Sequence, residues 1–305
     1  MKAIVCKKSG SPEVLKFAEL ERPIPKQNEI LIKVIASSVT RGDVNLRKIP
    51  RSILIPLGFL FGFKPMKISG VEFTGLVEAI GSDVKLFNKS DNVYGTTTGL
   101  QFGANAEFVC VPEKSKKGVI VKKPDNISFI DAAVIPVGGM TALHILNKIN
   151  INPGCRILIY GSSGSVGTYA VQLAKYFGAE VTAVCSTNNI EILKSIGSDY
   201  VIDYHTEDFR KGITSYDIIF DAVGKLTRSS CKKVLKKNGH FLSVKYPTKE
   251  KTEYMIFLNE LIESGKLKPV IDRTYTLDKV KDAHYYVEQG HKKGNVVITV
   301  ADSNN

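Results

Sequence analysis

One stretch, Arg156–Val171, constrains the fold of this chain more than any other. It begins with an apolar run, Ile157–Tyr160, which is typical of a strand buried on both faces of a parallel sheet. Three glycines follow at a spacing of three residues: Gly161, Gly164 and Gly167. Apolar residues then recur at helical spacing, and a second strand-like run, Val181–Cys185, comes after them. Strand, glycine turn, helix and strand together predict a βαβ unit.

The three glycines have distinct physical roles in a nucleotide-binding unit of this kind. Gly161 permits the tight bend that leaves the strand, Gly164 leaves room for a pyrophosphate beside the backbone, and Gly167 allows the helix to pack closely on the strand. The N–H groups at the start of the helix then face the anion. A glycine turn without a ligand is the alternative, and the presence of both flanking elements favours the dinucleotide site.

The end of the second strand indicates which dinucleotide binds. NAD sites usually carry Asp or Glu there, about 20 residues beyond the glycines, for the ribose 2′-hydroxyl. Here the strand ends in Ser186, Thr187 and Asn188, which are able to hydrogen-bond a 2′-phosphate and do not repel it. The sequence therefore favours NADPH, with Lys194 as the nearest basic residue.

The composition is that of a globular protein with room for two domains. The chain has 305 residues, of which 43% are hydrophobic and 24% are charged. Its formal charge is +12, but the basic residues occur in scattered pairs, so a nucleic-acid partner is not expected. The five widely spaced cysteines predict no disulfide framework, and the first residues lack the layout of a signal peptide. We expect a cytoplasmic protein with a small-molecule substrate and no membrane partner.

The pattern along the chain predicts a mainly β domain and an α/β domain. Residues 1–125 alternate strand-like runs with turns, and residues 266–305 are expected to rejoin them. The clearest strands of the first domain are expected at Ile30–Ile35, Val71–Ile80, Ala106–Val111 and Val119–Val121. Residues 126–265 form the nucleotide-binding domain, and Pro124–Asn152 at its start is predicted to be helical.

The α/β domain is expected to be a doubly wound sheet of five parallel strands, because strands and helices alternate along it. After the βαβ unit, further strands are predicted at Tyr200–Ile202, Asp217–Phe220 and Gly239–Val244. Helices are predicted at Ile190–Ile196, Ser229–Lys236 and Met255–Glu263.

One apolar segment, Ile53–Phe63, lies between the expected strands of the first domain. It contains Pro56, Gly58 and Gly62, and it is too short and too interrupted to span a membrane. We expect a loop packed on the core or the hydrophobic wall of a substrate pocket.

The order of its motifs makes the chain resemble the medium-chain dehydrogenase/reductase superfamily, and within it the zinc-independent quinone oxidoreductase-like branch. The stretches that carry the resemblance cover nearly the whole chain: Ser38–Arg47, Gly70–Gly81, Asp91–Gly95, Ala132–Leu143, Gly161–Ala174, Gly197–Tyr204 and Gly290–Val300. The resemblance implies a GroES-like, mainly β domain, a Rossmann domain and a cofactor in the cleft between them. It also implies reduction of quinones or α,β-unsaturated carbonyls by NADPH.

The resemblance assigns candidate site residues position by position. The pyrophosphate turn is matched by Gly161, Ser163, Gly164, Ser165, Val166 and Gly167. Positions that approach the adenosine ribose or its 2′-phosphate are matched by Ser186, Thr187 and Tyr204. Positions near the nicotinamide are matched by Thr40, Asn45 and Thr141. The loop after the fourth strand is matched by Val223 and Gly224, and the C-terminal turn that touches the cofactor by Gly294 and Asn295.

Hydride transfer to an electron-poor carbon depends on orientation and exclusion of water more than on a dedicated acid. Asn45 and Thr40 are the candidates for polarising a substrate carbonyl, and Tyr94 is a further one that more often serves as a core aromatic. An NADPH-binding protein without turnover, acting through a partner or RNA, is the alternative function.

No metal is expected. The zinc-dependent branch places ligands where this chain reads Arg41-Gly42-Asp43 and Gly70-Val71-Glu72. The five histidines show no ligand spacing with the cysteines.

The segment Lys245–Thr252 is shorter than the family pattern, which usually has a further helix and a sixth Rossmann strand at this place. In the family that strand often pairs across a dimer interface. Lys245, Pro247, Lys249 and Lys251 discourage pairing at an exposed edge. We therefore expect a monomer or a dimer through another surface.

Overall fold

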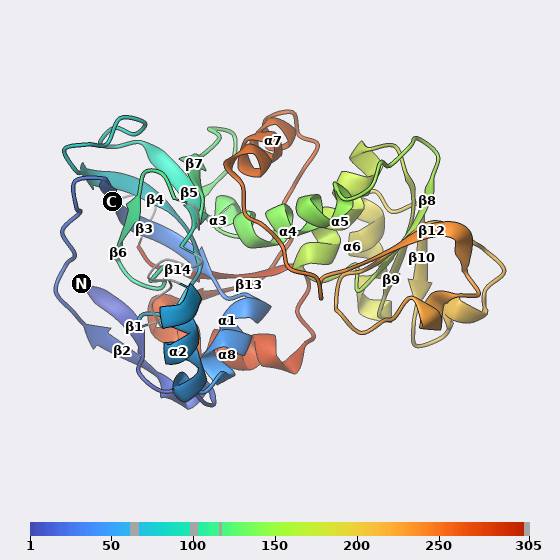
Figure 1. The fold of residues 1–305 in the computed structure, drawn as a ribbon, viewed down its shortest axis with the longest axis horizontal. Coiled ribbons are helices and arrows are strands. Elements are labelled where there is room, and N and C mark those ends of the chain that lie inside the picture. The colour runs from blue at the N-terminus through green and yellow to red at the C-terminus, as the bar shows by residue number, and fades with distance from the viewer. Residues whose placement is uncertain (62–66, 98–102, 116–117, 302–305) are drawn as a thin grey trace. The chain divides into compact units, whose positions relative to one another are not determined.

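The computed structural model describes residues 1–61, 67–97, 103–115 and 118–301 (Figure 1). The chain forms two compact units. Unit 1 comprises Met1–Val137, Lys251–Asn259 and Ile271–Asn305, and unit 2 comprises Gly138–Glu250 and Glu260–Val270. The domain limits expected from the sequence, 1–125 with 266–305 and 126–265, stay a prediction.

Unit 2 contains a sheet of five parallel strands in the order β10-β9-β8-β11-β12. The strands are β8 Arg156–Tyr160, β9 Glu180–Cys185, β10 Tyr200–Asp203, β11 Tyr216–Asp221 and β12 Leu235–Ser243. This order confirms the predicted doubly wound sheet, and β12 lies at an edge as expected. The chain reverses direction along the sheet between β8 and β11. Ligands of such sheets bind at this switch point, outside the carboxyl ends of the strands.

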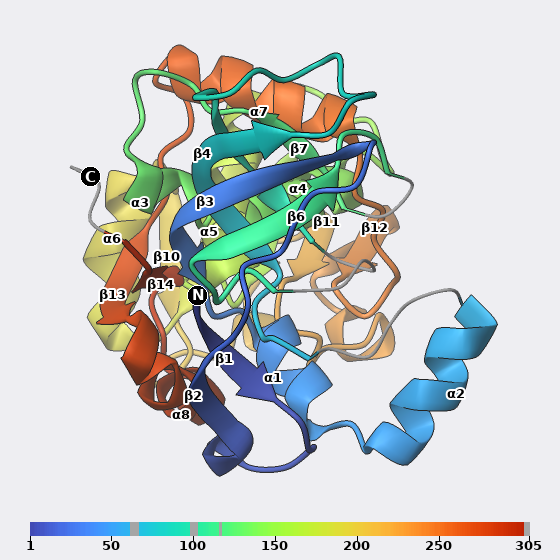
Figure 2. The same ribbon diagram turned by 90° about the vertical axis from the view of Figure 1, so that its left-hand side faces the viewer.

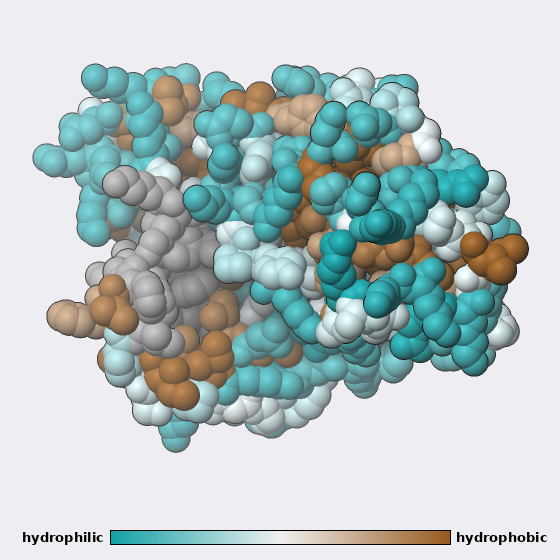
Figure 3. Space-filling view, turned by 45° about the vertical axis from the view of Figure 1, so that its right-hand side comes forward, coloured by the Kyte–Doolittle hydropathy of each residue, from teal (hydrophilic) through white to brown (hydrophobic). Residues whose placement is uncertain are grey.

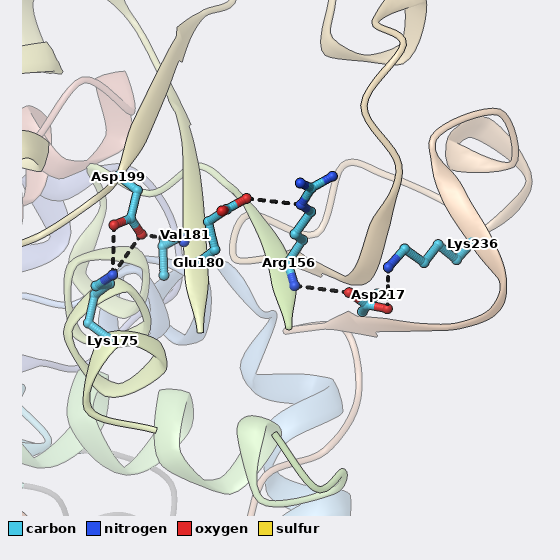
Figure 4. A network of polar contacts seen from close by, with 7 residues as sticks. All are labelled: Arg156, Lys175, Glu180, Val181, Asp199, Asp217 and Lys236. Carbon is cyan, nitrogen blue, oxygen red and sulfur yellow. Dashed lines mark hydrogen bonds and ion pairs between the residues drawn. The ribbon is translucent and has the colours of Figure 1, made fainter. Parts of the chain in front are cut away.

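Charged groups tie the amino ends of these strands together, at the side of the sheet opposite to the switch point (Figure 4). The Lys175 ammonium lies 2.7 Å from both carboxylate oxygens of Asp199, and Asp199 accepts the N–H of Val181. Asp217 likewise accepts the backbone N–H of Arg156 at 3.0 Å. These contacts therefore connect the strand ends that lie away from the switch point.

The helices of unit 2 follow the prediction except at one place. Those after β8 and β9 are α5 Ser165–Tyr176 and α6 Ile190–Ser195. The predicted helix Ser229–Lys236 is wrong: a 3₁₀ turn at Ser229–Cys231 and a short turn over residues 232–234 precede β12. The Ser230 hydroxyl donates to the carbonyl of Thr227 and accepts the Thr227 N–H, so the local side chain competes with helical hydrogen bonding.

Unit 1 is built on a seven-stranded sheet with strand order β13-β14-β3-β4-β5-β7, in which β6 also pairs with β3, and on a separate β1-β2 pair (Figure 2). The strands are β1 Lys2–Cys6, β2 Leu15–Glu19, β3 Glu29–Ser38, β4 Glu72–Ile80, β5 Asn92–Thr96, β6 Phe108–Pro112, β7 Ile120–Lys122, β13 Ile271–Thr276 and β14 Asn295–Thr299. The pairing of β14 with β3 confirms that the tail rejoins the first domain.

The remaining helices are α1 Arg41–Lys48, α2 Arg51–Phe61, α3 Phe129–Ala132, α4 Pro136–Leu146, α7 Thr252–Glu263 and α8 Val280–Gln289. The stretch predicted as helical before β8 thus holds two helices. Pro136 begins the second of them, where its missing N–H costs no hydrogen bond.

The expectation of a core-packed loop at Ile53–Phe63 is wrong for its described part, because α2 occupies it (Figure 2). Pro56 lies inside the helix, and four of the large apolar side chains are exposed: Ile53, Ile55, Phe59 and Leu60. Pro56 and Gly58 suggested that regular structure is interrupted here, but the helix continues through both residues. Residues 62 and 63 of the segment lie outside the described residues.

Candidate functional site

The glycine turn after β8 has the geometry that the sequence predicts. Gly161 has φ +75°, a left-handed conformation that favours glycine, and a Cβ atom on it would lie 2.0 Å from Val223 Cγ2. A Cβ on Gly167 would lie 2.3 Å from the Gly161 carbonyl oxygen. Both positions therefore require glycine for the packing of the turn itself.

Gly164 differs, because the structure leaves space beside it. A Cβ there would find its nearest heavy atom, the Gly161 oxygen, at 3.5 Å. Gly164 is also the N-cap of α5; a glycine has no side chain with which to cap the helix, and the first turn has no acidic residue. The N–H groups of the first turn, which include those of Ser165 and Val166, are therefore arranged to bind an anion.

Asn189, which the sequence analysis did not single out, joins the turn to the end of β9. Its buried amide donates to the hydroxyl oxygens of Ser163 at 3.0 Å and Ser186 at 2.9 Å. A hydroxyl that accepts such a bond keeps its own proton for donation. The structure thus brings two predicted residues together and leaves the proton of each hydroxyl available for donation.

Thr187 is arranged differently from Ser186. Its hydroxyl donates to Asp203, the last residue of β10, and Asp203 also accepts the N–H of His205 at 3.0 Å. These hydrogen bonds, that from Thr187 first, lower the pKa of Asp203. Tyr204 is half-exposed beside them, with its ring centroid 4.5 Å from that of His205. The Thr187 hydroxyl therefore donates to Asp203 on the neighbouring strand, a carboxylate that the residues at the end of β9 did not predict.

Asp221 shapes the loop after β11. This buried carboxylate accepts the N–H groups of Val223 at 3.2 Å, Gly224 at 2.8 Å and Leu226 at 2.9 Å. Gly224 has φ +80°, and Val223 is held over Gly161. The loop predicted to touch the cofactor therefore lies against the glycine turn at the switch point.

Thr141, predicted near the nicotinamide, is a partly buried residue of α4. One turn earlier, a Cβ on Gly138 would lie 2.5 Å from the Ser165 hydroxyl oxygen. Gly138 therefore permits the close approach of α4 to the start of α5.

Thr40 and Asp43 form a capping box at the start of α1 in unit 1. The Thr40 hydroxyl donates to Asp43 Oδ2 at 2.6 Å and accepts the Asp43 N–H at 3.1 Å. Burial raises the pKa of Asp43 to about 6, and its Oδ1 has no hydrogen-bond partner among the described residues. Asn45 lies one turn further along α1 and is exposed.

Glu72 is a second buried carboxyl in unit 1, in β4. It accepts the hydroxyl of Ser38 and the backbone N–H of Val137, the latter at 2.8 Å. Burial raises the pKa of Glu72 to about 7 against the effect of these hydrogen bonds, and the nearby charge of Asp43 acts in the same direction as burial. An acid inside an apolar strand was the sequence signal for this residue.

Lys292 supplies the positive charge near Glu72. Its ammonium donates to the Gly294 carbonyl at 2.7 Å, and burial lowers its pKa to about 8 although Glu72 opposes the shift. Gly294 has φ +65°, and Asn295, which begins β14, is buried. The predicted C-terminal turn is thus held by a lysine that the sequence analysis did not identify.

Tyr94 belongs to the core of unit 1. It is fully buried, and its hydroxyl donates to the side chain of Asn259 in α7.

His284, also buried, accepts a hydrogen bond from Arg47 at 2.9 Å, and burial, followed by the charge of Arg47, lowers its pKa to about 3.

The described ranges contain no group of three or more His, Cys, Asp or Glu side chains that could hold a metal ion. The expectation that the chain acts without a metal stays a prediction. In the same part of the chain, no helix has both the length and the apolar character needed to cross a membrane.

Comparisons with known proteins cover both units. Residues 26–125 match the alcohol dehydrogenase GroES-like domain, and residues 165–268 and 247–298 match zinc-binding dehydrogenase models. The chain is 35% identical to the 2-methylene-furan-3-one reductase of Solanum lycopersicum, over 95% of this chain and 76% of that protein. It is 32% identical to the chloroplastic NADPH-dependent alkenal/one oxidoreductase of Arabidopsis thaliana, over 98% and 79%.

A solved structure gives the same result. The quinone oxidoreductase from Coxiella burnetii superposes with a TM-score of 0.84 at 30% identity, and the match covers 99% of both chains. With the glycine turn at the switch point and relatives along nearly its whole length, the chain belongs to the medium-chain dehydrogenase/reductase superfamily, in its quinone oxidoreductase-like branch.

Proposed function

We propose that the chain is an NADPH-dependent oxidoreductase that reduces quinones or α,β-unsaturated carbonyl compounds. The observation that carries the proposal is the open, uncapped start of α5 at Gly164, beside the hydroxyls of Ser163 and Ser186 that Asn189 orients. Relatives named as alkenal/one and quinone oxidoreductases support the substrate class.

The residues of unit 2 fit the phosphates of such a cofactor. First-turn N–H groups of α5 bind the pyrophosphate, and Gly164 permits its approach. Ser186 would hold the 2′-phosphate through its hydroxyl proton, together with the half-exposed Tyr204. The neighbouring Asp203 accepts the Thr187 hydroxyl, and this hydrogen bond lowers its pKa and so favours the ionised carboxylate.

When bound, the nicotinamide supplies the hydride, and the protein orients the acceptor. The Thr40 hydroxyl is engaged in both directions with Asp43. We therefore assign orientation of the substrate carbonyl to the exposed carboxamide of Asn45. Thr40 caps α1 and so positions the helix that carries Asn45.

Turnover with a panel of enones and quinones tests the activity. Oxidation of NADPH that requires the acceptor supports the proposal. Tight NADPH binding without turnover of any acceptor would favour the alternative of a binding protein without catalysis.

Cofactor choice is tested separately by titration with NADPH and NADH. We expect tighter binding of NADPH, because Ser186 occupies the place of the acid that selects NAD. Equal or tighter binding of NADH would contradict the assignment.

We place the enzyme in the cytoplasm, as a monomer or a dimer through a surface other than β12. Relatives carry chloroplastic and mitochondrial names. Fractionation of cells with an antibody against the chain decides the compartment.

A further inference from the structure

The outward face of α2 is apolar. Its exposed large side chains are Ile53 at 50%, Ile55 at 55%, Phe59 at 95% and Leu60 at 73%. Gly58 is buried and Leu54 is half-buried. At about 100° per residue the exposed side chains share one broad face, opposite to Leu54 and Gly58. Apolar surface at the lower left of Figure 3 corresponds to this region. A surface helix usually turns polar side chains to solvent, whereas this helix turns apolar side chains outward.

The segment around α2 is rich in basic residues and contains no acid of its own. Between Asp43 and Glu72 the sequence has no Asp or Glu, and its basic residues are Arg47, Lys48, Arg51, Lys64 and Lys67. Arg47 and Lys48 share one partner, Glu288 of α8. The helix itself carries no charged residue after its first position.

Further lysines lie next to the end of this segment. The backbone carbonyl of Lys67 accepts the N–H of Cys6 at 2.8 Å, so Lys7 and Lys8, which follow Cys6, lie near Lys67. All three lysines are exposed. The N–H of Gly10 donates to the carbonyl of Arg47 at 3.1 Å, which places the chain after Lys8 near the start of α2.

We propose that α2 is a membrane-docking helix, which inserts its outward face into the surface of an anionic lipid bilayer while the neighbouring lysines contact the headgroups. Exposed apolar patches of this kind mark interaction sites. Helices that lie in the membrane interface combine an apolar face with nearby basic residues. Burial of the apolar face and attraction of the basic residues to anionic lipids both contribute to binding. The proposal replaces the expectation from sequence that the chain has no membrane partner.

Charge decides between a bilayer and a second copy of the chain. A symmetric contact through α2 would bring two segments together that are rich in Lys and Arg and lack acids, and like charges repel. An anionic lipid surface is complementary to the same segment. A bilayer is therefore the occupant that fits.

The chain has no tryptophan, so a single introduced tryptophan reports on its own position. We expect the fluorescence of Phe59→Trp to shift to shorter wavelength when vesicles of phosphatidylcholine with phosphatidylglycerol are added, and to shift little with phosphatidylcholine alone. Ile213→Trp, at a fully exposed apolar position in unit 2, is the matched control and should not respond. The absence of a shift in Phe59→Trp would overturn the proposal.

Flotation of the full chain with the same vesicles measures the contributions of the apolar face of α2 and of the neighbouring lysines to membrane binding. Phe59→Ser with Leu60→Ser should weaken partitioning by about tenfold or more, because two large apolar side chains are removed. Lys67→Glu should also weaken it, whereas the exposed control Lys237→Glu should not. Unchanged partitioning of the serine variant would refute docking through α2. A wild-type dimer that the serine variant converts to a monomer, without any vesicle binding, would show that a second copy covers the helix.

Discussion

A Cβ atom on Gly167 would lie 2.3 Å from the carbonyl oxygen of Gly161, whereas one on Gly164 would meet no heavy atom nearer than 3.5 Å. The two glycines are alike in the sequence pattern but serve different purposes at the scale of residues. Gly167 is required by the packing of α5 on the turn. Gly164 is required only when a ligand approaches the backbone.

Gly164→Val is therefore expected to fold and to lose NADPH. The side chain finds space in the protein alone but occupies the place of the pyrophosphate, so the Kd should rise by more than about tenfold, or about 1.4 kcal/mol. The matched variant Gly167→Val should instead lower the free energy of unfolding. Fluorescence titration and urea unfolding measure the two effects. Unaltered NADPH affinity in Gly164→Val would show that this glycine is structural.

Glu72 gives a residue-scale prediction about pH. The folded protein holds the Glu72 proton up to about pH 7, whereas the ordinary pKa of this group is 4.5. Because the folded state binds the proton more tightly, the free energy of unfolding falls as pH rises through this interval, by at most ~3 kcal/mol. Below the interval both states are protonated and this loss is absent.

The variant Glu72→Gln removes the titrating group and should weaken the dependence of stability on pH between these limits. Its amide can still bond Ser38 and Val137, so the fold should remain. Glu191→Gln, at an exposed ion pair, is the control and should leave the dependence unchanged. Urea unfolding at a series of pH values checks this, and an identical dependence in Glu72→Gln would refute the assignment.

At the scale of elements, Arg47 joins α1 to α8. Its fully buried guanidinium contacts Glu288 at 2.6 Å, His284 at 2.9 Å and the carbonyl of Gly10 at 3.0 Å. Burial keeps His284 neutral, so its Nδ1 is able to accept from the guanidinium. The arginine thus stabilises the helix that carries Thr40 at its cap and Asn45 on its surface.

Arg47→Ala should lower the free energy of unfolding by roughly 3–5 kcal/mol, because it leaves buried partners without their cation. Lys48→Ala removes a lysine that contacts the same Glu288 but is 54% exposed, and it should cost less than about 1 kcal/mol. Urea unfolding measures the free energy of unfolding of both variants. An equal loss in Arg47→Ala and Lys48→Ala would contradict the greater importance of the buried arginine.

Elements whose signal is local could be predicted from the sequence. The strand, glycine turn and helix at β8 and α5 were predicted because each depends on neighbouring residues. The helix predicted at Ser229–Lys236 failed because Ser230 bonds to Thr227 and the strand begins early. The helix α2 was predicted as a loop because Pro56 and the glycines suggested an interruption.

The site could be predicted where residues act through their own backbone position, as in the glycine turn. Asn189, Asp221, Glu72 and Lys292 were not identified. Asn189 acts through contacts between separate elements, which residue type alone does not reveal. Asp221 and Lys292 bind backbone groups two to five residues further along, and only Glu72, an acid inside an apolar strand, had a signal in the sequence. Thr187 was placed correctly at the end of β9, yet its bond to Asp203 depends on the neighbouring strand.

At the scale of the whole molecule, β12 leaves one edge of the sheet of unit 2 without a further strand among the described residues. The segment after it carries Lys245 and Pro247, which discourage edge pairing. Outward amides of β12 should therefore exchange hydrogen rapidly at every protein concentration. Protection that increases with concentration, measured by hydrogen–deuterium exchange, would instead indicate a dimer paired through this edge.

The central claim is that the chain transfers hydride from NADPH to an unsaturated acceptor, and isotope transfer tests it most directly. The wild-type protein is incubated with an enone and NADPH that carries deuterium at the transferable position of the nicotinamide. Mass spectrometry of the product should find one deuterium on the carbon that accepts the hydride, and Gly164→Val should give none. Product without deuterium, or no product from any enone or quinone, would contradict the account.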